Sequence, residues 1–157
     1  MSIAASVERH LQQLGVKYDV IPHHHTSNSA YSAQAAHVPG NQLAKCVILE
    51  DDEGYVMAVL PATRKVNLGA LHSRFGRDLE IAMEDELAEL FVDCERGAMP
   101  PLGDAYGIDV VVDKSLVGNQ DIYFESGDHC GLVHVSGADF LRLMGDAPRA
   151  AISYGPH

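Results

Sequence analysis

Basic residues, long apolar segments and paired cysteines are all scarce in this chain. Its 11 lysine and arginine residues stand against 22 acidic residues, so the net charge is −11 at pH 7 with histidine neutral. Non-specific binding to nucleic acids depends on neutralising phosphates, so this balance argues against such binding and against DNA as a partner. No apolar stretch approaches the roughly 20 residues needed to cross a bilayer, and the N-terminal residues lack a signal-peptide pattern. We therefore expect a cytoplasmic protein with no membrane partner.

The three cysteines are isolated along the chain and odd in number. Cys46, Cys94 and Cys130 form no C-x-x-C pair. They therefore predict neither a disulfide framework nor a structural zinc site. We expect small, partly buried thiols instead.

A cluster of histidines leaves a metal-binding enzyme open as an alternative. His23, His24 and His25 are adjacent, and His10 and His37 lie nearby in the sequence. Clustered histidines can bind zinc or nickel. Adjacent residues of a strand point to opposite faces, however, and the chain has no H-E-x-x-H motif. The sequence therefore favours a function without a native metal.

The chain is long enough for one domain with a substantial core. It has 157 residues, of which 46% are hydrophobic and 21% charged, and these are ordinary globular values. No internal repeat or interdomain linker is visible, so residues 1–157 are expected to form a single domain. Hydrophobic periodicity and capping residues predict helices over 3–14, 31–37, 68–75, 84–91 and 140–144. They predict strands over 18–21, 43–49, 55–60, 79–83, 108–112, 122–124 and 132–135, with no clear pattern over 148–157. Short strands mixed with helices indicate an α+β, or mixed α/β, fold.

Four of the basic residues lie close together in the sequence. Arg64, Lys65, Arg74 and Arg77 form either a docking patch or an ordinary solvated face. The solvated face is the simpler interpretation.

Residues 43–49 (LAKCVIL) predict a strand covered on both faces. With a period of two, Lys45 shares its face with apolar residues, while Cys46 points to the opposite face. Burying a lysine without a partner costs several kcal/mol, as an order of magnitude. Lys45 therefore either extends its ammonium group to water, as most such lysines do, or points into a pocket that needs a cation.

Residues 97–103 (GAMPPLG) predict a rigid loop. Glycine at both ends permits unusual backbone angles and close approach of a ligand to the main chain. Two consecutive prolines stiffen the middle and remove two N–H donors. The loop is either a preorganised cradle for a small molecule or an ordinary connector.

His129 follows Gly127 and Asp128 between two predicted strands. A histidine that titrates near neutral pH can position a substrate or carry a proton. The alternative is a turn histidine at the surface.

These features, in this order, resemble the YbaK/ProX family of aminoacyl-tRNA deacylases, which also occurs as the editing insertion of bacterial prolyl-tRNA synthetases. The resemblance extends from about Val16 to Met144. It rests on the lysine strand and the G-x-x-x-P loop together with three further segments. The matching segments are LAKCVIL (43–49), VLPATRKVNL (59–68), GAMPPLG (97–103), IDVVVD (108–113) and IYF (122–124).

The resemblance implies a curved, mixed and mostly antiparallel sheet with helices packed around it. It also implies hydrolysis of the ester that joins a wrong, small amino acid to tRNA, such as alanine or cysteine on tRNA(Pro). His129 matches a histidine of the alanine-editing branch. Cys46 departs from the family, because the alanine-editing branch often has asparagine at this position and the cysteine-editing branch threonine.

The resemblance assigns roles to particular residues. Lys45 and His129 are the expected catalytic residues, with Lys45 contacting the ester carbonyl or a phosphate and His129 positioning the substrate. The expected substrate-binding residues, among which Cys46 and Met99 would set the size of the pocket, are Cys46, Gly97, Ala98, Met99, Pro100, Pro101 and Gly103. The expected partners are the acceptor end of a mischarged tRNA and prolyl-tRNA synthetase. No metal or other cofactor is expected. The alternative function is a non-catalytic module that binds aminoacyl-tRNA or a synthetase.

Overall fold

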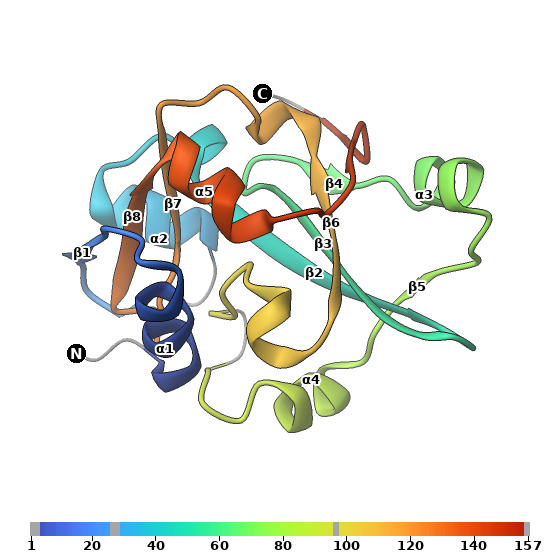
Figure 1. Cartoon of the computed structure of the whole chain (residues 1–157), viewed down its shortest axis with the longest axis horizontal. Helices are drawn as coiled ribbons and strands as arrows, with labels where there is room; N and C mark the ends of the chain where they lie inside the picture. The colour runs from blue at the N-terminus through green and yellow to red at the C-terminus, as the bar shows by residue number, and fades with distance from the viewer. Residues whose placement is uncertain (1–3, 26–28, 96–97, 156–157) are drawn as a thin grey trace.

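The chain folds into a mixed α+β structure, as the sequence predicts (Figure 1). The computed structural model describes residues 4–25, 29–95 and 98–155. The helices are α1 (Ala5–Leu14), α2 (Ser29–Ala36), α3 (Leu68–Phe75), α4 (Glu84–Leu90) and α5 (Gly137–Met144). The strands are β1 (Asp19–Pro22), β2 (Ala44–Asp51), β3 (Gly54–Pro61), β4 (Lys65–Val66), β5 (Glu80–Ile81), β6 (Asp109–Asp113), β7 (Asp121–Glu125), β8 (Gly131–Ser136), β9 (Arg149–Ala150) and β10 (Ser153–Tyr154).

The strands form one mixed sheet and two smaller antiparallel sheets. The mixed sheet has the order β5-β2-β3-β6-β9, in which β3 and β6, and β6 and β9, are parallel. β2 and β3 form a long antiparallel hairpin that pairs Lys45 with Leu60 and ends at the Asp51–Gly54 pair. The smaller sheets have the orders β1-β8-β7 and β10-β4. This arrangement confirms the mixed, mostly antiparallel architecture that the resemblance implies.

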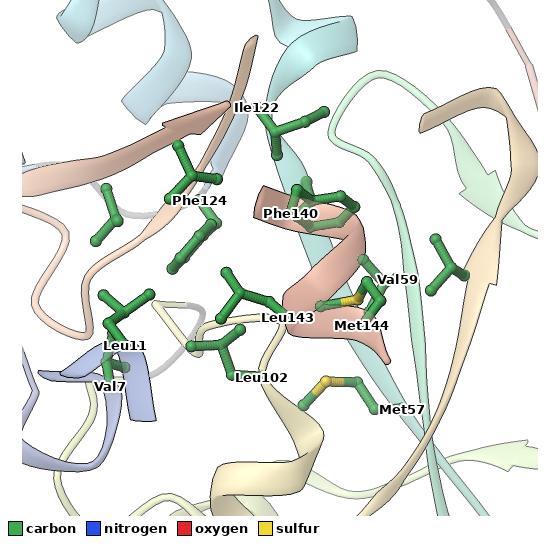
Figure 2. Close-up of a cluster of buried hydrophobic side chains, with 14 of the residues drawn as sticks. Val7, Leu11, Met57, Val59, Leu102, Ile122, Phe124, Phe140, Leu143 and Met144 are labelled. Carbon is green, nitrogen blue, oxygen red and sulfur yellow. The ribbon is translucent and has the colours of Figure 1, made fainter. Parts of the chain in front are cut away.

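Apolar side chains cover both faces of β2, which confirms the prediction for residues 43–49. Ala44 and Ile48 belong to the main core, which α1 and α5 complete (Figure 2). Leu49 belongs to a second cluster on the opposite face, where Leu71 of α3 packs. Figure 2 labels residues of the main core from α1, β3, β7, α5 and the segment before β6: Val7, Leu11, Met57, Val59, Leu102, Ile122, Phe124, Phe140, Leu143 and Met144.

Capping residues end or start the helices where the sequence predicts them. Gly15 ends α1 with a φ of 65°. The Asn67 side chain accepts a hydrogen bond from the Ala70 N–H at the start of α3, and Ser136 accepts one from the Asp139 N–H at the start of α5. Each cap satisfies a backbone group that the helix itself leaves without a partner.

Two edges of the fold differ from what the sequence pattern indicates. The strand expected over 79–83 is reduced to β5, because only the two pairs Leu49–Ile81 and Glu50–Glu80 join it to β2. The segment 148–157, which has no sequence pattern, contains β9 and β10. These short strands form by pairing with β6 and β4, which lie far away in the sequence.

Two of the basic residues near α3, Arg64 and Arg77, are held by neighbouring groups of the protein. Arg64 donates hydrogen bonds to Ser153, and Arg77 donates to both carboxylate oxygens of Asp51 at 2.7 and 2.5 Å. The exposed Arg74 lies in the last turn of α3. Among the described residues, no helix is long and apolar enough to span a bilayer.

Candidate functional site

Lys45 lies at the start of β2 with a half-buried side chain. Its ammonium nitrogen Nζ donates to the carbonyl oxygen of Ala62 at 3.4 Å. Burial lowers the pKa of Lys45, and the neighbouring charge of Lys65 lowers it further. Strand alternation directs Lys45 to the face of β2 opposite to Cys46, as the sequence predicts. The side chains of Lys45 and Cys46 therefore contact groups on opposite faces of the strand.

Cys46 joins β2 to the loop that precedes β6. Its thiol sulfur lies 3.4 Å from the carbonyl oxygen of Met99 and 3.7 Å from that of Pro100, with the S–H as the donor. Burial raises the pKa of the Cys46 thiol to about 12, and Cys94 and Glu125 add to this effect. At neutral pH the thiol is therefore a protonated donor and not a nucleophile. The structure thus brings together two motifs that lie more than fifty residues apart in the sequence.

We predict that Cys46 resists alkylation in the folded protein. With a pKa near 12, its thiolate fraction at pH 8 is about 10⁻⁴, so alkylation should be about 1000-fold slower than for an ordinary cysteine. Mass spectrometry after iodoacetamide treatment measures this rate, and unfolded protein provides the fully reactive control. Labelling of Cys46 at the rate of free cysteine would contradict the neutral-thiol assignment.

The described part of the loop, residues 98–103, packs inward. Ala98, Pro100 and Pro101 are buried and Met99 is half-buried. The Ala98 N–H donates to the carbonyl oxygen of Glu95 at 3.1 Å, so it does not serve a ligand in this conformation. Gly97, which the sequence also assigns to substrate binding, lies outside the described residues.

Gly103 is needed for packing at the end of the loop. A Cβ atom there would overlap the Val110 side chain and lie 2.6 Å from the carbonyl oxygen of Ile108. Gly103 therefore fixes the end of the loop against the segment that enters β6. The loop is a rigid connector at this end, while its Met99 and Pro100 carbonyls face Cys46.

His129 is buried, which excludes the interpretation as a surface turn histidine. It is 2% exposed and adopts a φ of 57°, a left-handed conformation unusual for a non-glycine residue. The Asp128 carboxylate stabilises this turn by accepting hydrogen bonds from the Ser126 hydroxyl at 3.0 Å and the Cys130 N–H at 2.9 Å. The turn therefore directs the imidazole into the protein.

Glu125 and His25 lie against His129, and the sequence analysis predicted neither contact. Glu125 Oε2 lies 2.9 Å from His129 Nδ1. The exposed His25 presents its ring edge-on to His129, with centroids 6.1 Å apart, and its Nε2 lies 2.9 Å from Glu95 Oε2. An acid at the inner end of an apolar strand was a signal for Glu125 in the sequence. The other two contacts join separate loops and have no local signal.

The histidine-rich segment does not form a recognisable metal centre. In the part of the chain that the structure describes, no group of three or more His, Cys, Asp or Glu side chains is arranged to hold a metal ion. His25 is paired with Glu95, and the backbone N–H of His23 donates to Cys130.

A cavity of about 510 Å³ lies away from these residues, between α3, β6 and the segment after α5. Its lining includes Leu71, Phe75 and Val111 together with Asp109 and Asp146. None of the predicted site residues lines it. Its charged lining residues are Asp104, Asp109, Asp146 and Arg77, so the cavity is acidic on balance and unfavourable for the phosphates of a nucleic acid.

Comparison with known proteins identifies the family of the chain. A family model described as an aminoacyl-tRNA editing domain matches residues 23–143. This match includes Lys45, Cys46, the loop and His129, and it confirms the editing family that the sequence resembles. No curated protein matches the chain significantly.

Solved structures show the same fold. A hypothetical protein is 23% identical with a TM-score of 0.83, and the alignment covers 95% of this chain and 99% of that one. A candidate trans-editing enzyme for prolyl-tRNA synthetase is 22% identical with a TM-score of 0.81, covering 97% of each chain. A candidate signal-transduction protein from Marinobacter aquaeolei VT8 is 20% identical with a TM-score of 0.79, covering 98% of this chain but 31% of that longer chain.

Proposed function

Because the chain belongs to the aminoacyl-tRNA editing domain family, we propose that residues 1–157 act as one domain that hydrolyses the ester of a mischarged tRNA in trans. The observation that supports this most is the contact between Cys46 and the carbonyls of Met99 and Pro100. It joins the lysine strand to the G-x-x-x-P loop within the matched region. The turn that holds the buried His129 is joined to the same loop, because the Glu95 N–H donates to the Gly127 carbonyl and the Glu95 carbonyl accepts from the Ala98 N–H.

The proposed reaction is attack of water on the carbonyl carbon of the aminoacyl ester. Negative charge develops on the carbonyl oxygen, the bond to the terminal ribose breaks, and the ribose oxygen takes up a proton. Each donor aimed at the developing oxyanion contributes about 3 kcal/mol, judging by deletions in other hydrolases. An aminoacyl ester is already an activated acyl group, so neither a cofactor nor a metal is required. A hydroxyl of the terminal ribose orders the attacking water, and His129 positions the substrate.

Selection of the amino acid in this proposal is steric. Cys46 and the half-buried Met99 limit the space for the side chain, so a small residue such as alanine or cysteine is the expected substrate on tRNA(Pro). A single methylene changes binding by only about 1–3 kcal/mol, which is why synthetases need a separate editing site. The neutral Cys46 thiol is close in size to the asparagine and threonine found at this position in related branches.

Of the two roles open to Lys45, contact with a phosphate of the acceptor end fits the geometry better. Its ammonium group lies beside Ala62 and Lys65, on the face of β2 away from Cys46. Two neighbouring cations suit a phosphate, whereas the ester carbonyl would lie on the Cys46 side. In this arrangement Lys45 holds the terminal nucleotide while the acyl group enters beside the loop.

The charge of the protein makes delivery of the tRNA a separate requirement. At −11, the chain should bind tRNA weakly and with strong dependence on salt. The proposal therefore includes prolyl-tRNA synthetase as the partner that supplies mischarged tRNA in the cytoplasm. Tight tRNA binding that persists at high salt would contradict this part of the proposal.

A panel of mischarged tRNAs tests the function. We expect release of the amino acid from at least one tRNA that carries a small, wrong residue, and slower release from correctly charged Pro-tRNA(Pro). Binding measured in parallel separates an enzyme from a binding module. Binding without turnover on every tRNA of the panel would support the module and reject the deacylase.

A further inference from the structure

We propose that Glu125 is a positioning residue for this site, which fixes the orientation and protonated nitrogen of His129 so that the two side chains act as one unit during ester hydrolysis. The activity test of this inference rests on the proposed function, whereas its structural test does not. Glu125 is the last residue of β7, and His129 lies in the turn that leads to β8. Nothing in the family match or in the similar structures assigns a role to this carboxylate.

The burial of the pair is the first observation that supports the proposal. The side chains of His129 and Glu125 are 3% and 1% exposed, with Nδ1 and Oε2 2.9 Å apart. The carboxylate and the imidazole are in contact without hydrogen-bond geometry, and neither oxygen of Glu125 has a hydrogen-bond partner among the described residues. Burying a carboxylate costs several kcal/mol unless a cation or donor compensates it, as an order of magnitude. Within the described structure, the imidazole is the group that supplies this compensation.

The backbone of the turn is the second observation. His129 adopts a φ of 57°, a left-handed conformation that is strained for a non-glycine residue. Gly127 adopts a φ of 113°, and a Cβ there would lie 2.8 Å from the Ala4 Cβ. The bonds that Asp128 accepts hold the turn in this shape. An apolar side chain would fill this part of the core without a strained backbone or a buried charge. Strained residues of this kind concentrate at functional sites.

The position of the pair links it to the site. The Glu95 N–H donates to the Gly127 carbonyl at 2.7 Å, and the Glu95 carbonyl accepts from the Ala98 N–H at 3.1 Å, so the turn that holds His129 is joined to the start of the 98–103 loop. The exposed His25 lies edge-on to His129, which places the pair directly beneath the surface. A carboxylate at Nδ1 favours a proton on that nitrogen and so determines the state of Nε2, the same device that orients other catalytic histidines.

The structural test uses nitrogen-15 NMR of the His129 ring and needs no substrate. In the unaltered protein we expect Nδ1 to be protonated, and we expect Glu125→Gln to shift the ring nitrogen signals of His129. Asp121→Asn is the matched control, because Asp121 is also on β7 and pairs with His134 at 2.8 Å, at the opposite end of the strand. It should leave the His129 signals unchanged. An unprotonated Nδ1 in the unaltered protein, or identical signals in Glu125→Gln, would overturn the proposal.

The activity test is a double-mutant cycle on the panel substrate that is hydrolysed fastest. We expect Glu125→Gln to lower kcat by about 10- to 100-fold with little change in KM, and His129→Ala to lower it at least as much. If Glu125 acts through His129, the double variant is no slower than His129→Ala alone. Effects that multiply in the double variant would overturn the positioning role. Absence of turnover by the unaltered protein would reject the proposed function, and the NMR result would still decide the pairing.

Discussion

Replacing Lys45 with alanine is expected to lower kcat/KM for deacylation of a mischarged tRNA by between about 10- and 150-fold, since a hydrogen bond to a charged group contributes about 1.5–3 kcal/mol. Most of the loss should appear in KM, because a phosphate contact exists before and during the reaction. The same substitution should reduce the magnitude of the slope of log affinity against log salt concentration by about 1, as expected for the loss of one phosphate contact. Steady-state rates and binding measured at several salt concentrations give both quantities.

The exposed Lys114 provides the matched control for this experiment. Lys114→Ala removes the same charge from the protein as Lys45→Ala does. It should change kcat/KM by less than about twofold. If Lys45→Ala deacylates mischarged tRNA as fast as the parent protein, the proposed mechanism is wrong. A loss confined to kcat would instead place Lys45 at the ester carbonyl.

Replacing Gly103 with alanine is expected to destabilise the protein by about 2 kcal/mol, because overpacking a filled site costs about 1–3 kcal/mol. The added Cβ would overlap Val110 and press on the Ile108 carbonyl, so the loop must move. Movement of the loop would also separate Met99 and Pro100 from Cys46. We therefore expect a lower free energy of unfolding in urea and a lower deacylation rate at temperatures where the variant is folded.

Gly69 provides a control for this substitution. It lies in α3 and is exposed, and a Cβ there would be 3.4 Å from the Asn67 side chain, which is ordinary contact. Gly69→Ala should stabilise the helix by up to about 1 kcal/mol. A Gly103→Ala variant with an unfolding free energy within about 0.5 kcal/mol of the parent would mean that the loop adapts easily, contrary to a rigid anchor.

The sequence predicted the parts of the fold that depend on local pattern. The strand around Lys45 followed from its apolar run, the end of α1 from the conformational freedom of Gly15, and the starts of α3 and α5 from the capping side chains of Asn67 and Ser136. The strands β9 and β10 were missed, because their residues become strands only by pairing with distant segments.

The candidate site was predictable as a set of segments but not as a geometry. Alternation along β2 already separated Lys45 from Cys46, yet the contact of Cys46 with the loop depends on the packing of distant segments. The burial of His129 depends on Glu125 and on a strained turn, and neither follows from the residue types in that turn. The loop was expected to offer backbone donors, but the Ala98 N–H is already bonded to Glu95.

The most direct test of the proposed deacylase function is the rate at which the unaltered protein releases alanine from Ala-tRNA(Pro), compared with the rate for the same tRNA without protein. We expect the protein to accelerate release of alanine by at least about 100-fold, which is the contribution of a single well-placed donor in other hydrolases. We also expect Pro-tRNA(Pro) to be hydrolysed more slowly under the same conditions. If release of alanine, and of every other small amino acid on the panel, is no faster with the protein than without it, the chain is not a deacylase.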